Sequence, residues 1–228
     1  MAKIFQILLL LSITITWIMP TFTVAQTRDV GAIGSVALSK DFGRSWDAKL
    51  EQELRFNHNL STFDRSLTSI GVDYALIRNF LKAQVDYDFI YQRQNDYFEF
   101  RHRTSAALAT SISCRSLDFE LRTRGQAIWR DESRGDYKFN PRYVWRNKLE
   151  CSYKIFGSPV KPFASGEVFL PLNSAHDFYM DGYRVTLGLK YRTSQHASLQ
   201  FYLRYDQDVQ QANPKSILYG GVGWNYKL

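Results

Sequence analysis

The charged residues of this chain that could do chemistry recur at every second position of long stretches. Within LDFELRTRGQAIW, residues 117–129, the charged positions are Asp118, Glu120, Arg122 and Arg124. A period of two is the side-chain period of a β-strand, so these residues share one face of a sheet. Because guanidinium groups fit carboxylate and phosphate groups, such a face predicts either ion pairing within the protein or binding of an anion.

Pairing of consecutive strands as hairpins predicts a cluster of these charges. The expected neighbours are Arg101 and Arg103 for Asp88, Lys148 for Glu120, and Arg146 for Arg122. The full predicted cluster comprises Asp88, Arg101, Arg103, Glu120, Arg122, Arg124, Arg146 and Lys148. Two interpretations stay open: an ion-pair network that fills a small barrel, which we favour, or a narrow conduit or pocket for anions. The second needs a gap in the filling, which the sequence cannot show.

Two groups of residues are candidates for catalytic sites. His102 and Thr104 share an apolar face with Phe98 and Phe100, an arrangement similar to that of outer-membrane phospholipases. That family has serine in place of Thr104, and neighbouring apolar faces offer no acidic or amide side chain to orient His102. The omptin proteases use acids and a His–Asp pair at a barrel rim, and the residues here that could correspond are His176, Asp177, Asp206 and Asp208.

No omptin motif accompanies those residues, so that analogy rests on the fold alone. His58 and His196 fall in expected connections, and the sequence has no metal-ligand spacing, phosphate-binding glycine loop or nucleic-acid motif. We therefore predict a protein that is not an enzyme, with no catalytic, cofactor-binding or metal site.

The alternation extends through most of the chain and predicts the elements that hold the charges. Stretches with this period are WDAKLEQELRF (46–56), LKAQVDYDFIY (81–91), YVWRNKLECSY (143–153), YRVTLGLKY (183–191) and ASLQFYLRY (197–205). We predict an all-β fold, a transmembrane antiparallel up-and-down β-barrel of about 10 strands from about residue 44 onward. VGAIGSVALSK (30–40) is a further candidate strand. Because bacterial single-chain barrels have even strand numbers, with both ends in the periplasm, we prefer ten and keep 12 as the alternative.

Strand length and aromatic placement indicate which face points inward. A soluble lipocalin-like carrier would hold the apolar face inside, whereas a membrane barrel turns it to lipid. Several stretches reach about 11–15 residues, and about 9–11 suffice to cross a bilayer. Aromatic residues gather near strand ends, as in the two interfacial girdles of membrane barrels. We therefore predict that the apolar face meets lipid and the charged face lines the lumen.

The beginning of the chain predicts export. Residues 1–25 contain a single charge, at Lys3, then an apolar run that ends before Pro20 and a small-residue site ending at Ala25. This is the pattern of a secretory signal peptide, and the run is short for a membrane-spanning helix. We expect residues 26–228 to form a single outer-membrane β-barrel domain. The net charge of +7 suits a charged lumen or lipopolysaccharide phosphates better than nucleic acid, which an exported protein does not meet.

Two cysteines, Cys114 and Cys151, would meet an oxidising compartment, where disulfides form. The expected strands place another strand between them, a separation of roughly two 4.8 Å steps that exceeds disulfide reach. We therefore expect free thiols unless a turn folds over the gap.

Several stretches resemble a family of uncharacterised outer-membrane β-barrel proteins of Gram-negative bacteria, a domain of unknown function. They are LSKDFGRSWDAKLEQELRF (38–56), YFEFRHR (97–103), YVWRNKLECSY (143–153) and KPFASGEVFLPL (161–172). The final ILYGGVGWNYKL (217–228) is similar to the C-terminal strand that barrel-assembly factors recognise, although it ends in Leu228 where those strands end in Phe or Trp. The resemblance implies the bacterial outer membrane, with its lipid, lipopolysaccharide and barrel-assembly machinery as partners, and names no activity.

Together these observations predict an outer-membrane β-barrel with a charged, largely filled lumen and a structural, binding or narrow-conduit role. The alternatives are a barrel hydrolase acting on lipid or peptide, and a soluble periplasmic lipocalin-like carrier. The oligomeric state does not follow from the sequence.

Overall fold

The computed structural model describes residues 27–94, 97–134, 137, 139–173, 179–210 and 214–228. The segment predicted to be a signal peptide lies outside these residues. The described strands are β1 (Thr27–Phe42), β2 (Trp46–Asn57), β3 (Thr62–Ile77), β4 (Leu81–Arg93), β5 (Phe98–Cys114), β6 (Leu117–Arg130), β7 (Arg142–Tyr153), β8 (Val160–Pro171), β9 (Gly182–Arg192), β10 (Ala197–Asp208) and β11 (Lys215–Lys227). A short 3-10 helix, η1 (Glu132–Arg134), precedes β7. In the part of the chain that the structure describes, no helix is long and apolar enough to span a membrane.

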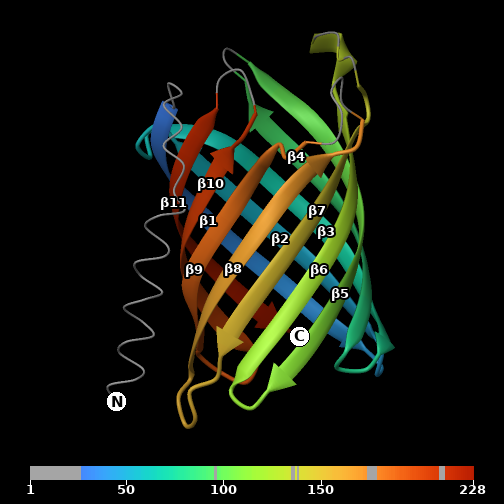
Figure 1. Cartoon of the computed structure of the whole chain (residues 1–228), viewed down its shortest axis with the longest axis vertical. Helices are drawn as coiled ribbons and strands as arrows, with labels where there is room; N and C mark the ends of the chain where they lie inside the picture. Colours follow the sequence, from blue (N-terminus) through green and yellow to red (C-terminus); the bar gives the residue numbers. More distant parts are fainter. Residues whose placement is uncertain (1–26, 95–96, 135–136, 138, 174–178, 211–213) are drawn as a thin grey trace.

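The strands close into one barrel in which each strand pairs with its neighbours along the chain (Figure 1). The last neighbours, β1 and β11, run parallel, with register from Thr27 opposite Lys215 to Ser39 opposite Lys227. All other neighbouring strands are antiparallel. The predicted all-β barrel is therefore confirmed.

The predicted number of strands is wrong, because the described residues form a closed wall of eleven strands rather than ten or 12. The segment 30–40, which the sequence left unassigned, belongs to β1. An odd number of up-and-down strands brings the first and last strands together in the same direction, so the barrel closes through a parallel pair. Odd-numbered barrels are known, as in the 19 strands of a mitochondrial channel.

The two ends of the barrel differ in their connections. Short turns at residues 43–45, 78–80, 115–116, 154–159 and 193–196 lie at one end, the lower end in Figure 1, which we call the short-turn end. The connections 131–141 and 172–181 are the longest of those at the opposite, long-loop end. Since β1 and β11 are parallel, β1 begins at the long-loop end and β11 finishes at the short-turn end. We expected the free ends of the first and last strands to lie on the same side of the barrel. The parallel pairing of β1 and β11 shows that this expectation is wrong.

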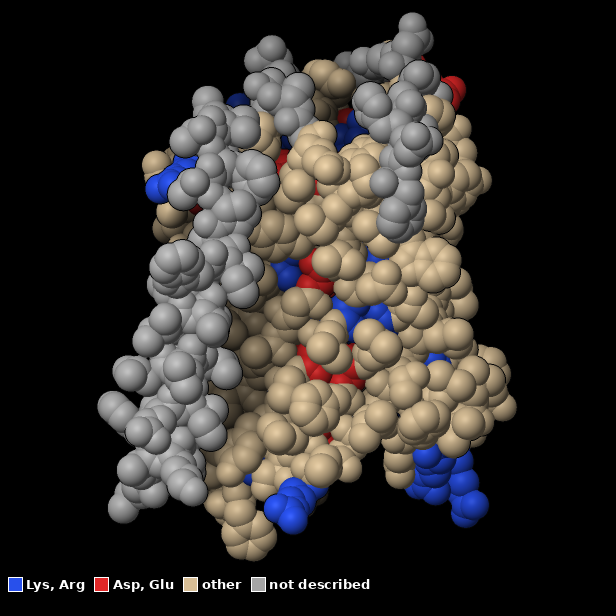
Figure 2. Space-filling model, viewed as in Figure 1, with Lys and Arg blue, Asp and Glu red and all other residues tan. Residues whose placement is uncertain are grey.

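The apolar face of the wall points outward. Val85, Leu203 and Ile70 are 63%, 59% and 58% exposed, whereas Asp88 and Arg204 are 3% and 6% exposed on the inner face. Figure 2 shows the outside of the wall as mainly uncharged surface, with Lys and Arg side chains projecting at the lower end. The apolar interior that a lipocalin-like carrier requires is therefore not what the described residues form.

Aromatic rings pack over glycines inside the barrel. Tyr202 on β10 lies opposite Gly221 on β11, and a Cβ atom at Gly221 would overlap the Tyr202 ring. Phe163 on β8 covers Gly188 on β9 in the same way. Each ring occupies the space that a side chain at the facing glycine would need. This contact helps to fix the strand register.

Both cysteines are free thiols in this structure. Cys114 ends β5 opposite Leu117, and Cys151 lies on β7 opposite Phe119, so β6 separates them. The intervening strand is the one that the sequence predicted.

A glycine pair on β11 tests the internal packing. We expect Gly221→Val to force Tyr202 aside and to cost about 1–3 kcal/mol, the usual range for overpacking. Gly220→Val, whose new side chain would meet nothing within 4 Å on the outer face, is the matched control and should leave stability nearly unchanged. The measurement is the temperature at which the folded barrel loses its characteristic gel mobility. Equal loss in both variants would contradict the packing described here.

Candidate functional site

The predicted charge cluster lies along the inner wall but forms several contacts rather than one group. Asp88 on β4 and Arg103 on β5 are opposite each other, as predicted, and their charged atoms are 2.6 Å apart. Arg101 instead pairs with Glu99 at 2.9 Å, and Glu99 is 1% exposed. Arg101 therefore pairs with an acid on its own strand, and Arg103 pairs with an acid on the neighbouring strand.

The predicted register between β6 and β7 is wrong by two residues. Glu120 lies opposite Glu150, Arg122 opposite Lys148, and Arg124 opposite Arg146. A shift of two residues leaves every side chain on the same face, so the alternating pattern cannot detect it.

The ion pairs formed by Arg124 and Lys148 do not cross the β6–β7 hairpin. Arg124 pairs with Asp86 at 3.0 Å and Lys148 pairs with Glu150 at 2.7 Å. Both acids were left out of the predicted cluster, although each sits on the charged face of an expected strand. The alternation itself was the signal that could have found them.

The main ion-pair network crosses β7, β8, β9 and β10. Arg146 donates to Glu167 from Nε at 3.0 Å and from Nη2 at 2.8 Å. Arg184 donates two hydrogen bonds to Asp206, at 2.8 and 2.9 Å, and its Nη1 lies 3.4 Å from Glu167. We call Arg146, Glu167, Arg184, Asp206 and Arg204 the central network; Arg204 Nε lies 3.2 Å from Asp206.

Aromatic rings support the guanidinium groups of the central network. The Phe169 ring lies 4.8 Å from the Arg146 guanidinium carbon and 5.1 Å from that of Arg184. The Tyr219 ring lies 4.9 Å from the guanidinium carbon of Arg204. Arginine faces attract the electron-rich faces of such rings. Most of this network lies outside the predicted cluster, which is confined to β4, β5, β6 and β7.

The filling of the lumen has a gap beside the central network. A cavity of about 280 Å³, which we call the chamber, lies against Glu51, Glu53 and Glu167. Its basic lining residues are Lys49, Arg122, Arg146, Lys148, Arg184 and Arg204. The gap that an anion pocket requires is therefore present, and its lining holds six basic side chains against three acids.

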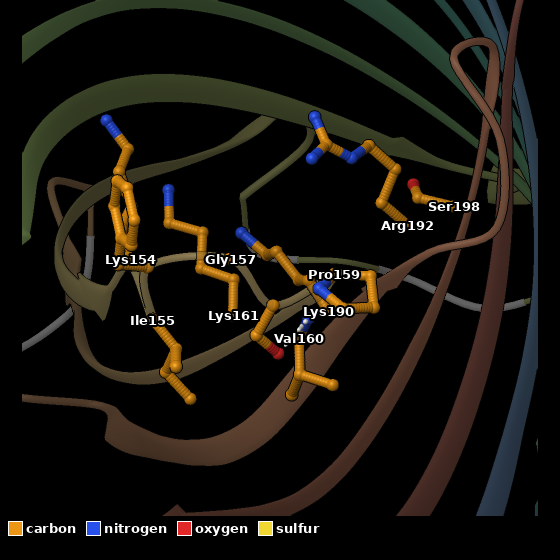
Figure 3. Close-up of a pocket in the computed structure, with 11 residues that line it drawn as sticks. Lys154, Ile155, Gly157, Pro159, Val160, Lys161, Lys190, Arg192 and Ser198 are labelled. Carbon is orange, nitrogen blue, oxygen red and sulfur yellow. Dashed lines mark hydrogen bonds between the residues drawn. The ribbon is translucent and has the colours of Figure 1, made fainter.

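The short-turn end holds a second, larger cavity of about 710 Å³. Lys154, Lys161, Lys190 and Arg192, which we call the basic mouth, line it, and Figure 3 shows their nitrogen atoms directed to the same side. Phe163 lies near both cavities, because it lines the chamber and its ring lies 4.8 Å from Lys190 Nζ.

The long-loop end has a different charge. A cavity of about 310 Å³ there is lined by the acids Asp64, Asp181, Asp206 and Asp208 and by the basic residues Arg65, Arg184 and Lys215. The electrostatic environment of the lumen therefore differs between its two ends.

Among the catalytic candidates that the structure describes, His102 and Asp206 lie on opposite faces of the wall. His102 is exposed on the outer face, and one ring nitrogen, Nδ1, shares a hydrogen bond with the Tyr87 hydroxyl at 2.6 Å. Its environment is aromatic, with the Phe89 ring centre 5.5 Å away. Asp206 is taken up by the central network inside the barrel. His176 and Asp177 lie outside the described residues, among which no group of three His, Cys, Asp or Glu could hold a metal ion.

Removal of one inner carboxylate should destabilise the barrel. Glu167→Gln takes the charge that faces both Arg146 and Arg184, and breaking such a buried pair costs about 3–5 kcal/mol. Glu51→Gln is the control, because its partner Lys49 is 48% exposed and surface pairs are worth about 0–1 kcal/mol. Urea unfolding in detergent micelles measures the difference. Equal stabilities would show that the central network does not hold the lumen together.

The fold is similar to that of two solved structures. The "Bacterial polysaccharide outer membrane secretin" is 15% identical with a TM-score of 0.53, over 78% of this chain and 63% of that chain. The "NanC porin structure in rhombohedral crystal form" is 14% identical with a TM-score of 0.50, over 80% of this chain and 88% of that chain. This chain thus spans less than two thirds of the secretin, and such low identity shows a likeness of fold alone.

No curated protein sequence matches the chain. A family model described as "Protein of unknown function (DUF2490)" matches residues 31–216, which is most of the barrel. The resemblance to an uncharacterised barrel family is thereby confirmed. The chain belongs to this family of proteins of unknown function, DUF2490.

Proposed function

We propose that this protein is an outer-membrane β-barrel protein that crosses the lipid bilayer with its strands, holds a charged and largely filled lumen, and does no covalent chemistry. The observation that carries the proposal is the distribution of side chains across the wall, which is apolar outside and charged inside. Leucine, isoleucine and valine side chains are about half exposed outside, while carboxylates and guanidinium groups are buried inside. Water would disfavour the outer surface, whereas lipid stabilises it.

Strand lengths support a bilayer-spanning wall. The shortest strand, β9, has 11 residues and the longest, β5, has 17. About 9–11 residues suffice for a tilted strand to cross the hydrocarbon core. A closed sheet also leaves no unpaired edge, which lipid requires because it offers no hydrogen bonds to the backbone.

Aromatic pairs near both ends of the barrel support the same proposal. Trp46 and Tyr74 lie 4.6 Å apart between ring centres near the short-turn end, and Tyr91 and Phe98 lie 4.7 Å apart near the long-loop end. Aromatic residues favour the two membrane interfaces, where their rings meet the headgroups. By analogy with bacterial barrels, the short-turn end would face the periplasm.

Lipid, lipopolysaccharide and the barrel-assembly machinery are the partners that this proposal implies. The outward side chains of β11, which include Leu218, Val222 and Trp224, would carry the assembly signal. The non-enzymatic role rests on His102, whose hydrogen-bond partner is the Tyr87 phenol rather than an acid that could orient a base.

Cell fractionation with heat-dependent gel mobility tests the membrane proposal. We expect the full chain in the outer-membrane fraction, extractable only with detergent, and migrating differently before and after boiling because closed barrels resist SDS. Release of the folded protein without detergent, with no mobility shift, would overturn the proposal.

A charge placed on the outer wall gives an independent test. Leu203, in the middle of β10, is 59% exposed, and Leu203→Arg should cost about 2–4 kcal/mol in lipid, where arginine near the midplane is unfavourable. Phe156→Arg, at a fully exposed position in the 154–159 turn, is the control and should be nearly neutral. The measurement is refolding yield and stability in lipid vesicles. In a water-exposed wall, Leu203→Arg would be harmless.

A further inference from the structure

The chamber contains a buried guanidinium group in which two nitrogens have no hydrogen-bond partner among the described residues. Arg204 lines the chamber and is 6% exposed. Its Nη2 has no hydrogen-bond partner among the described residues, and its Nε makes only a loose ion pair with Asp206, outside hydrogen-bond geometry. The Asp206 carboxylate is already engaged by two hydrogen bonds from Arg184. Buried donors without acceptors are rare and unfavourable, so a further hydrogen-bond acceptor would stabilise the Arg204 guanidinium group.

A second basic residue borders the same space without a fixed partner. Arg122 on β6 lines the chamber, and in the described part of the chain no carboxylate lies within ion-pairing distance of it. Lys148 and Arg146, its neighbours on β7, are paired with Glu150 and Glu167. Arg122 and Arg204 therefore supply donors that the protein's own acids leave unused.

Size and charge both favour a small anionic solute. The cavity of about 280 Å³ is close to the lower limit of small-molecule pockets, roughly 300 Å³. The basic mouth lies at the short-turn end, where Lys161 and Lys190 pair with Asp118 and Glu150. At the long-loop end four acids and three basic residues line the cavity. The excess of basic charge that attracts an anion is therefore that of the chamber itself.

We infer that the chamber is a binding site for an oxyanion, a carboxylate or phosphate group of a small solute, held by Arg204 and Arg122. This inference rests on the proposed barrel function and deepens it by assigning a ligand class to the lumen. Guanidinium groups suit both oxyanions because their paired donors match two oxygens at once. The Tyr219 ring, 4.9 Å from the guanidinium carbon of Arg204, restricts where that group can move.

The test uses the full folded chain in neutral detergent, with sodium phosphate and sodium glucuronate as probes and sodium chloride at equal ionic strength as reference. Calorimetric titration and the unfolding temperature are both recorded. We expect saturable binding of at least one probe, with a matching rise in unfolding temperature. The two probes distinguish a phosphate site from a carboxylate site.

Three variants assign the binding to the chamber. Arg204→Gln and Arg122→Gln should each weaken binding at least tenfold, whereas Arg44→Gln, an exposed arginine in the 43–45 turn, should stay within threefold of the parent chain. Arg122→Gln breaks no ion pair, so it remains informative if Arg204→Gln fails to fold. Phosphate also stabilises proteins by exclusion from their surfaces, and that effect neither saturates nor depends on Arg122.

The inference is overturned if neither probe binds more tightly than chloride, or if Arg122→Gln binds like the parent chain. A protein that keeps its heat-dependent gel mobility while failing this test would contradict the anion site and leave the barrel function intact. Loss of the mobility shift in the parent chain would instead contradict the barrel function.

Discussion

Closure of the sheet by β1 and β11 is the constraint on which the rest of the structure depends. Their parallel register, from Thr27 to Ser39 along β1, pairs the two strands that would otherwise be edges. A closed wall satisfies its backbone hydrogen bonds within itself, and it separates an inside from an outside. Only with that separation can arginines and glutamates gather away from the apolar outer surface.

The interior shows how a small barrel accommodates many charges. Side chains of both signs, with aromatic rings over glycines and beside guanidinium groups, occupy much of the space between the strands. Buried ion pairs repay their loss of hydration only when their geometry is good, as in the two hydrogen bonds from Arg184 to Asp206. Where that geometry is absent, at Arg204, the lumen also opens into the chamber.

The charged side chains of the lumen are distributed unevenly along its length. Lysines border the short-turn end, where Asp118 and Glu150 pair with three of them. Four acids and three basic residues line the cavity at the long-loop end, and the chamber with its excess of basic side chains lies between the two ends. Charges in a low-dielectric environment act over longer distances than charges in water, so in the proposed binding role the chamber attracts anions. This member of the DUF2490 family thus has a candidate site inside its barrel as well as a fold.

The sequence by itself determined the strand positions, the separation of apolar and charged faces and the Asp88–Arg103 pairing, because a period of two assigns faces without reference to the rest of the chain. It could not determine strand number, the β6–β7 register or the chamber. A shift of two residues leaves the pattern unchanged, and whether residues 30–40 join the wall depends on pairing with a strand at the far end of the chain. Only the closed tertiary structure decided which charges meet and which guanidinium groups remain without acceptors, since those contacts join distant strands.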